Sequence, residues 1–325
     1  MFFSRGQIIE ILSSEDVSLR DDLCARAHNA RLKYAGEGIH YRGLIEISNL
    51  CRKNCLYCGI RRGNKVVTRY DMPDNQIFEL TNIAYLKGYD YVMIQAGERQ
   101  DASFISRIES IIATITQRYN GKMKVALSLG EQTEATYSRW HEAGAARYLL
   151  RIEASNENLY HKIHPCDNTH SYDVRKNAVA TLKKCGFLTG SGVMIGLPFQ
   201  TIENLADDLL WLRDMEVDMC GMGPYIPHSQ TPLYQYKDII PSEEKRVDLT
   251  LKMTAILRLM MPHINIASTT ALSTLHPDGS LSCGANVLMP RLTPCTDCYK
   301  LYDSYEQSAY HHPDNGLSHK RFPGE

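Results

Sequence analysis

The sequence has no long apolar run and almost no excess of charge of either sign. Its net charge is -1 over 325 residues, so the chain has no global field that would attract nucleic acid or an anionic membrane. The N-terminus, MFFSRGQIIEILSSED, lacks the apolar core of a signal peptide, and no later stretch is apolar for long enough to span a bilayer. These absences predict a cytoplasmic protein that binds neither nucleic acid nor membrane.

Cysteine, in contrast, is abundant, with ten residues in the chain. Without a secretory signal, these cysteines are expected to be reduced thiols. Metal binding or catalysis is therefore favoured over a framework of disulfides.

Short β-rich runs alternate with longer amphipathic segments along most of the chain. Eight such runs are residues 43–48, 91–95, 125–129, 148–152, 192–196, 219–224, 264–268 and 285–289. The alternation predicts a parallel sheet, and eight strand–helix units are enough for an α/β fold of the closed (β/α)8 TIM-type barrel kind. An open doubly wound sheet is the alternative, although no early GxGxxG motif follows a first strand. We expect N-terminal helices over residues 1–36, the barrel over 37–302 and a polar C-terminal tail over 303–325.

A loop with three closely spaced cysteines, SNLCRKNCLYCGIRR, follows the first predicted strand. Active sites of such barrels lie at this end of the strands. A structural zinc site closes with four protein ligands, whereas a [4Fe–4S] cluster held by only Cys51, Cys55 and Cys58 has one iron with an open position. A zinc site completed by Cys24 or His40, or three unrelated core thiols, are the alternatives.

The CxxxCxxC spacing after the first strand of a barrel, with Tyr57 before Cys58, resembles the radical S-adenosylmethionine (SAM) superfamily. The resemblance implies that the open iron chelates the amino and carboxylate groups of SAM. It further implies that one-electron reduction releases a 5′-deoxyadenosyl radical. Within the superfamily, seven stretches resemble the HydE family of [FeFe]-hydrogenase maturases in order and spacing: CLYCGIRRGN, LSLGE, RYLLRIE, GLPFQT, GPYIPHSQTPL, ASTTALST and CGANVLMP. Biotin synthase and methylornithine synthase are related families, but they lack the stretches GPYIPHSQTPL and CGANVLMP.

The resemblance implies a set of SAM-binding residues: Tyr57, Gly97, Glu98, Glu153, Arg175, Met194 and Ile195. A carboxylate such as Glu98 suits the SAM ammonium, and the planar guanidinium of Arg175 suits its carboxylate. The alternatives are salt bridges at the barrel rim for the charged residues and core packing for Met194 and Ile195.

For the substrate, the resemblance implies a cavity lined by Arg151, Thr269, Thr270, Met289 and Tyr299. An inward arginine is costly without an anion, which favours ligand binding at Arg151, whereas the threonine pair is also explained by β-propensity. The family substrate is an organometallic cysteine–Fe(CO)2(CN) species whose sulfur the radical attacks. Another small sulfur-containing or amino-acid-like substrate is the alternative.

The chain departs from the HydE pattern at a few positions. Ile152 stands where histidine is frequent, and Ala126 where some members have threonine. Only Cys295 and Cys298 stand where many members hold a second cluster, so we predict two reduced surface thiols there. Zinc or a smaller cluster, completed by His311 or His312, is the alternative. The remaining cysteines are expected to be packing residues: Cys24, Cys166, Cys185, Cys220 and Cys283.

A group of basic residues surrounds the cysteine triplet: Arg52, Lys53, Arg61, Arg62 and Lys65. It is either a solvated rim or a docking site for an acidic ferredoxin or flavodoxin that supplies the electron. Together these features predict an oxygen-sensitive radical SAM enzyme with one [4Fe–4S] cluster, acting beside other maturases in assembly of the hydrogenase cofactor. A non-catalytic iron–sulfur electron carrier or scaffold is the alternative from another class.

Overall fold

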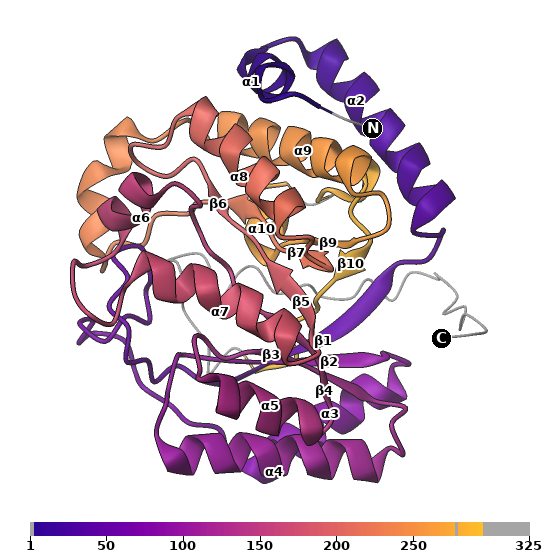
Figure 1. Cartoon of the computed structure of the whole chain (residues 1–325), viewed down its shortest axis with the longest axis vertical. Coiled ribbons are helices and arrows are strands. Elements are labelled where there is room, and N and C mark those ends of the chain that lie inside the picture. The colour runs from indigo at the N-terminus through magenta and orange to yellow at the C-terminus, as the bar shows by residue number, and fades with distance from the viewer. Residues whose placement is uncertain (1–2, 277–278, 295–325) are drawn as a thin grey trace.

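Eight parallel strands close into a barrel within residues 3–276 and 279–294, the part of the chain that the computed structural model describes (Figure 1). Around the barrel the order is β1, β2, β3, β4, β5, β7, β9 and β10, and β10 pairs with β1. Their bounds are β1 His40–Ser48, β2 Tyr91–Ala96, β3 Lys124–Ser128, β4 Ala145–Leu149, β5 Leu188–Ser191, β7 Met219–Cys220, β9 Asn265–Ser268 and β10 Val287–Leu288. The predicted (β/α)8 barrel is confirmed.

The fourth and fifth strands begin earlier than the apolar pattern predicts. The predicted runs were 148–152 and 192–196, but the barrel strands are Ala145–Leu149 and Leu188–Ser191. The sequence of β5, LTGS, has only one apolar residue besides glycine. The more apolar segment that follows it therefore gave the stronger strand signal. That run contains β6 (Met194–Ile195), which pairs with β8 (Gly223–Pro224) in a separate two-stranded sheet.

Gly192 allows the chain to pass from β5 to this second sheet. A Cβ atom at this position would lie 2.0 Å from the carbonyl oxygen of Gly221. Only a glycine therefore permits the two backbones to approach so closely. As a result, β6 and β8, which follow β5 and β7, pair beyond the carboxyl end of the barrel, where the candidate site lies.

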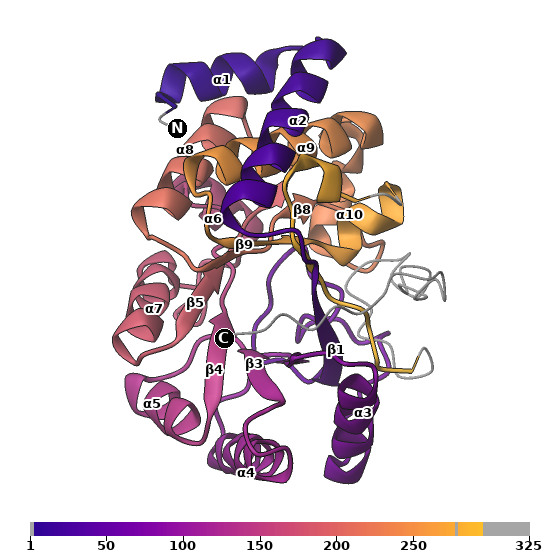
Figure 2. The same ribbon diagram turned by 90° about the vertical axis from the view of Figure 1, so that its right-hand side faces the viewer.

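Helices surround the barrel in the described part of the chain (Figures 1 and 2). They are α1 Arg5–Ser13, α2 Val17–Tyr34, α3 Asp74–Leu86, α4 Ala102–Arg118, α5 Glu134–Glu142, α6 Glu157–Ile163, α7 Tyr172–Lys184, α8 Ile202–Asp214, α9 Glu243–Met260 and α10 Thr270–Leu275, with 3-10 helices η1 Pro232–Ile239 and η2 Leu281–Cys283. Helix α4 illustrates how they form. Asp101 caps its first turn by accepting from the backbone N–H of Phe104 at 3.0 Å, and its apolar stripe, which includes Ile108 and Ile115, is fully buried.

Helices α1 and α2 precede the barrel and pack on its outside, against α8 and α9 (Figure 2). Ile8 and Leu12 of α1 are completely buried in the same core as Leu209 of α8. Buried Lys252 of α9 donates to the carbonyl of Ser14 at 2.7 Å, between the two helices. The N-terminal helices therefore share one core with the barrel.

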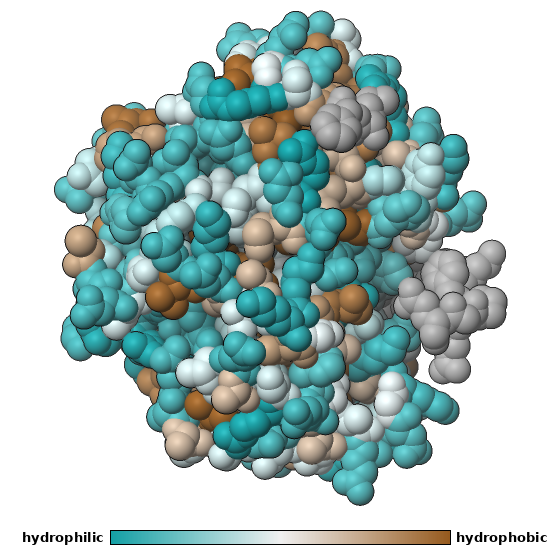
Figure 3. Space-filling view, viewed as in Figure 1, coloured by the Kyte–Doolittle hydropathy of each residue, from teal (hydrophilic) through white to brown (hydrophobic). Residues whose placement is uncertain are grey.

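The barrel interior is filled by side chains of the strands: Leu44, Tyr91, Met93, Ala126, Leu149, Met219, Ala267 and Val287. These residues make a packed core instead of a pore. On the face shown in Figure 3, hydrophilic residues predominate and hydrophobic ones lie in small, separate patches. None of the helices in the described ranges is both long and apolar enough to traverse a lipid bilayer.

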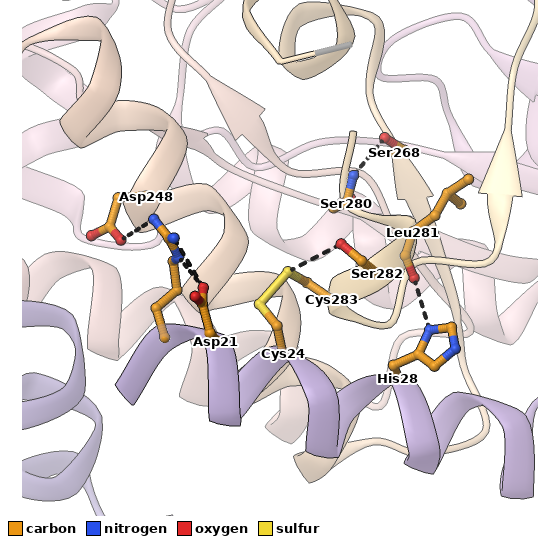
Figure 4. The surroundings of a disulfide bond; sticks show 10 residues. Asp21, Cys24, His28, Asp248, Ser268, Ser280, Leu281, Ser282 and Cys283 are labelled. Carbon is orange, nitrogen blue, oxygen red and sulfur yellow. Dashed lines mark hydrogen bonds and ion pairs between the residues drawn. A yellow bond between two sulfur atoms is a disulfide. The ribbon is translucent and has the colours of Figure 1, made fainter. Parts of the chain in front are cut away.

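A disulfide between Cys24 and Cys283 joins α2 to η2 (Figure 4). The expectation that both are reduced packing residues is therefore wrong, because two segments 259 residues apart bring the thiols together. Cys166 is exposed, in the loop between α6 and α7, so the packing prediction fails there too. Cys220 is fully buried as expected, and Cys185 is partly buried.

Loss of the disulfide should lower stability. A cross-link restricts the unfolded chain, and typical native disulfides contribute about 2–4 kcal/mol. We expect the double variant Cys24→Ser/Cys283→Ser to lose about this much unfolding free energy, measured by denaturant titration without reductant. Reductant should lower the wild-type midpoint and leave that of the variant unchanged. Equal midpoints for both proteins without reductant would show that the bond contributes nothing.

Candidate active site

The cysteine loop follows β1 at the carboxyl end of the barrel and is largely shielded from solvent. Cys55 is only 8% exposed, and Cys51 and Cys58 are partly buried. Burial raises the pKa of Cys55 to about 12, and it also raises the pKa values of Cys51 and Cys58. Charge on Cys51 further raises the pKa of Cys55, and charge on Cys55 and Cys51 further raises the pKa of Cys58. Three thiolates in such a place need a cationic partner, and iron is one.

Arg69 fixes the path of the loop through four backbone carbonyls. Its guanidinium donates to Asn49 and Ile60 at 2.6 and 2.8 Å. It also donates to the carbonyls of Arg61 and Asn64 at 2.7 and 3.1 Å. The sequence gives no signal for this role, since Arg69 stands outside every recognisable motif. The loop is thus held in shape by a residue that sequence reasoning missed.

The turn after β2 packs directly on the cysteine loop. The backbone N–H of Glu98 donates to Cys51 Sγ at 3.3 Å, and the N–H of Arg52 donates to the Glu98 carbonyl at 2.9 Å. At Gly97, a Cβ atom would lie 2.3 Å from the carbonyl oxygen of Leu50 and 2.8 Å from Cys51 Cβ. Gly97 is therefore required for this contact.

Replacing Gly97 with alanine should displace the cysteine loop. The added methyl group meets backbone atoms, which cannot rotate away as a side chain can. We expect the variant to retain less than about half of the iron and sulfide bound by the wild type after reconstitution, while it folds with a small loss of stability. Gly6→Ala is the control, because nothing lies within 4 Å of its Cβ position and its φ is not positive. Full iron loading of Gly97→Ala would contradict the proposed tight contact.

Four charged side chains form a buried network beside the loop. Glu131, which follows β3, lies 2.8 Å from Lys53 Nζ and 2.5 Å from Arg175 Nε. Glu98 lies 3.5 Å from Lys53 and 3.8 Å from Arg175. The Glu98 carboxylate also accepts from the backbone N–H of Glu131 at 2.8 Å. Two cations and two carboxylates thus converge from four segments of the barrel.

The two carboxylates of this network have pKa values shifted in opposite directions. Burial raises the pKa of Glu98, despite the nearby Arg175 and Lys53. Burial also acts on Glu131, but Arg175 and Lys53 outweigh it and its pKa is lowered. Glu131 is therefore the permanent partner of the two cations. Glu98 is the carboxylate that a further cation would stabilise in its charged form.

Lys53 belongs to this network and not to a solvated basic rim. It is 4% exposed and also donates to the carbonyl of Thr169. The expectation that it faces solvent is wrong, because the loop turns inward between Cys51 and Cys55. Arg62 and Lys65 are exposed as expected. Glu131 is the last residue of the LSLGE stretch, and the sequence alone indicates no role for it.

Glu153 follows β4 in a backbone conformation that side-chain-bearing residues rarely adopt. Its φ is 66°, which costs on the order of 1–3 kcal/mol. Its N–H donates to the carbonyl of Gly192, and its own carbonyl accepts from Met194, both at 3.1 Å. The carboxylate lies 3.0 Å from Arg151, whose guanidinium also donates to the carbonyl of Val193 at 2.7 Å. Burial raises the pKa of Glu153.

Tyr57 and Met194 lie in one apolar cluster between the cysteine loop and the sheet of β6 and β8. His164 donates through Nδ1 to the carbonyl of Tyr160 at 2.9 Å, which leaves Nε2 to accept from the Tyr57 hydroxyl at 3.3 Å. Ile195 is fully buried in the core that α8 and α9 share. The structure therefore separates Ile195 from Tyr57 and Met194, the other apolar residues of the expected SAM-binding set.

The residues expected at the substrate lie at or near the barrel interior. Met289 packs against the side chains that fill the barrel. Thr269 caps α10, and its Oγ1 accepts from the N–H of Leu272 at 3.4 Å. Thr270 is the partly buried first residue of that helix. Tyr299 lies outside the described residues, as do Cys295, Cys298, His311 and His312.

The geometry does not support either completion of a zinc site. Cys24 is in the disulfide, and His40 begins β1, at the opposite end of the strand from the cysteine loop. Among the described residues, no group of three His, Cys, Asp or Glu side chains is placed to hold a single metal ion. A cluster presents several separate irons to its ligands, so its thiolates need not converge on one atom. The donor set fits an iron–sulfur cluster.

Behind Glu153, the carboxylate of Asp208 in α8 is completely buried. Burial raises its pKa to about 7, although Ser155 donates two hydrogen bonds to it. Because the folded protein then binds a proton more tightly than the unfolded chain, stability should fall as pH rises from about 4 to about 7.

Asp208→Asn should remove this pH dependence. Relative to the wild type, the unfolding free energy of the variant should rise by about 3 kcal/mol between pH 5 and pH 8. Urea titrations of both proteins at several pH values measure the difference. A difference that does not change with pH would show that Asp208 does not titrate in this range.

Comparison with known proteins identifies the family. The model of the radical SAM superfamily matches residues 45–212, which include the cysteine loop, the charged network and Glu153. The chain is 43% identical over 307 residues to the [FeFe] hydrogenase maturase subunit HydE of Thermotoga maritima, covering 92% of this chain and 84% of that protein. The chain belongs to the radical SAM superfamily. It is a radical SAM enzyme of the HydE family.

More distant relatives share the fold of this radical SAM enzyme. The 3-methylornithine synthase of Methanosarcina acetivorans is 25% identical over 86% of this chain and 76% of its own length. The crystal structure of the methylornithine synthase PylB superposes with a TM-score of 0.78 at 22% identity, covering 98% of this chain and 89% of that one. The maturase HydG superposes with a TM-score of 0.74 at 20% identity, covering 89% and 65%. The superfamily implies a [4Fe–4S] cluster and SAM as cofactors, and the residues described above fit both.

Proposed function

We propose that this enzyme binds one [4Fe–4S] cluster through Cys51, Cys55 and Cys58 and leaves one iron open to SAM. The cluster, when bound, supplies the electron that cleaves SAM to methionine and a 5′-deoxyadenosyl radical. The observation that carries the proposal is the buried network of two cations and two carboxylates that touches the cysteine loop. A carrier of electrons would not need it.

The network suits the amino-acid end of SAM. Arg175 is already held by Glu131, so its planar guanidinium is fixed in orientation before a carboxylate arrives. Glu98, whose pKa burial raises, would gain a favourable partner in the SAM ammonium. We therefore assign Arg175 to the carboxylate and Glu98 to the ammonium, with Gly97 allowing the turn to approach.

We assign the remaining residues of the set to the adenosine part of SAM. Tyr57 and Met194 share one apolar cluster that offers a face to adenine. Glu153 stands between this cluster and Arg151, at a place where its buried carboxylate can accept from a ribose hydroxyl. Ile195 would support Met194 from the adjacent core and not contact the ligand itself.

We assign the substrate to the carboxyl end of the barrel, beyond its packed interior, near Arg151, Thr269, Thr270 and Met289. Tyr299, outside the described residues, is a further candidate from the sequence. The Thermotoga maritima relative is a hydrogenase maturase subunit, so we propose that this enzyme acts in assembly of the [FeFe]-hydrogenase cofactor. Its substrate would be a small sulfur-containing, organometallic species, and its partners the other maturases and a ferredoxin or flavodoxin in the cytoplasm. Arg151 can contact a carboxylate or cyanide of that substrate.

The experiment that tests the function is an anaerobic turnover assay. The protein is reconstituted with iron and sulfide, given SAM and dithionite, and analysed for 5′-deoxyadenosine and methionine. We expect equal amounts of both products. A protein that carries its cluster but forms neither product would be an electron carrier or scaffold instead.

A second assay separates hydrogenase maturation from work on another substrate. Apo-hydrogenase is incubated with the other maturases, with and without this protein, and hydrogen evolution is measured. Activation that depends on this protein supports the cofactor role. Cleavage of SAM without activation would indicate another small sulfur-containing or amino-acid-like substrate.

A further inference from the structure

Ser155 is held from two sides by side chains of α7 and α8, which lie outside the barrel (Figure 1). Its backbone N–H and its Oγ both donate to one oxygen of Asp208, at 2.7 and 2.6 Å. Its carbonyl accepts from the hydroxyl of Tyr172 in α7. Three hydrogen bonds therefore tie this one residue to two helices.

Ser155 follows Glu153 by two residues, directly after the strained turn. A residue such as Glu153 keeps a positive φ only when its surroundings fix it. Bonds to Gly192 and Met194 hold the turn at its beginning. The bonds from Ser155 to Asp208 hold it at its end. The direction of the Glu153 carboxylate thus depends on both.

Tyr172 also connects this turn to the helix that carries Arg175. The two residues are three positions apart in α7 and therefore lie on the same face of the helix. Arg175 in turn donates to the carbonyl of Arg151 at 3.4 Å. Contacts on both sides of Glu153, at Arg151 and at Ser155, therefore fix its position relative to Arg175.

Asp208 is an unusual residue for a purely structural role. Its side chain is completely buried, and its second oxygen, Oδ2, has no hydrogen-bond partner. Burying a carboxylate without full pairing is unfavourable. Its first oxygen, Oδ1, accepts both bonds from Ser155. A buried polar group that lacks full hydrogen bonding is more typical of a functional site than of a purely structural one.

We propose that Asp208 is a positioning residue for SAM: by holding Ser155, it fixes the Glu153 carboxylate relative to the Arg175 guanidinium. The inference rests on the proposed function, because it assumes that these two residues face one ligand. It adds a residue from outside the pocket that should determine SAM affinity without touching SAM.

The test compares Asp208→Leu, Asp208→Asn and the neighbouring control Asp207→Leu. Asp207 lies on the surface of the same helix, in an ion pair with Arg5. SAM affinity is measured from the change that SAM causes in the electron paramagnetic resonance (EPR) spectrum of the reduced cluster, and iron content is measured in parallel. We expect about tenfold or greater weakening for Asp208→Leu at unchanged iron content. Asp208→Asn keeps an acceptor oxygen and should stay within about threefold of the wild type, as should Asp207→Leu.

Tyr172→Phe gives a second, milder test that removes only the hydroxyl group. We expect about threefold weaker SAM binding at unchanged iron content, and this variant decides if Asp208→Leu does not fold. Wild-type affinity in both Asp208→Leu and Tyr172→Phe would overturn the proposal, as would equal weakening by leucine and asparagine at position 208. Failure of the wild-type protein itself to bind SAM would overturn the proposed function as well, and is seen before any variant is compared.

Discussion

Cys55→Ala should abolish both cluster binding and SAM cleavage. Cys55 lies between the other two thiols in the loop and is the most buried of the three. Two remaining thiolates cannot hold a [4Fe–4S] cluster that already lacks a fourth protein ligand. We expect iron content and 5′-deoxyadenosine formation to fall below about 5% of the wild-type values. Iron analysis and the visible absorbance of the cluster measure the first quantity, and product chromatography measures the second.

The matched control for this prediction is Cys166→Ala. Cys166 is exposed in the loop between α6 and α7, and the same atoms are removed there. It should retain its cluster and its activity. If Cys55→Ala kept turnover while Cys166→Ala lost it, the cluster would be in another part of the chain.

Arg175→Met should remove SAM binding and also destabilise the fold. The substitution leaves Glu98 and Glu131 with Lys53 as their one remaining cation in the described network. Breaking a buried ion pair from one side costs about 3–5 kcal/mol of stability. Loss of the bidentate partner of the SAM carboxylate should weaken SAM binding by about 100-fold, or about 2.7 kcal/mol.

Two further variants separate the causes. Arg175→Lys keeps the charge but loses the planar fork, so we expect recovered stability with SAM affinity still about tenfold weaker. Arg139→Met removes an arginine from a surface pair with Glu109 and should change neither quantity. Unaltered SAM affinity in Arg175→Met would refute the assignment of this residue to the ligand.

The sequence predicts the barrel well because its strands are read from local patterns. Seven of the eight predicted runs overlap a barrel strand. The exception, 192–196, misses β5 because three of the four residues of LTGS are small or polar. The cysteine loop was equally accessible, since its spacing is continuous in the sequence. The strand pattern and the cysteine spacing are both defined by residues that are close together in the sequence.

The features that the sequence could not predict are contacts between distant segments. Lys53 reads as one of several surface cations, and only the fold shows that Glu131 and Glu98 surround it. Arg69 binds carbonyl groups, which carry no sequence signal. The Cys24–Cys283 disulfide joins residues 259 positions apart.

Backbone strain is likewise invisible before folding. Glu153 was expected at the SAM site from its motif, but its positive φ and its connection to Asp208 depend on where α7 and α8 pack. Helix packing is set by the whole apolar face of each helix, so such positions cannot be read from a motif. These are also the places where the chain departs from the most stable local arrangement.

The most direct test of the central claim is electron–nuclear double resonance on the reduced cluster with SAM labelled with 15N at its amino group and 17O at its carboxylate. If three cysteines leave one iron open, both labels should show hyperfine coupling to the cluster. The same sample should show an EPR spectrum altered by SAM. An unaltered spectrum with no coupling to either label, in protein that carries a full [4Fe–4S] cluster, would contradict the account.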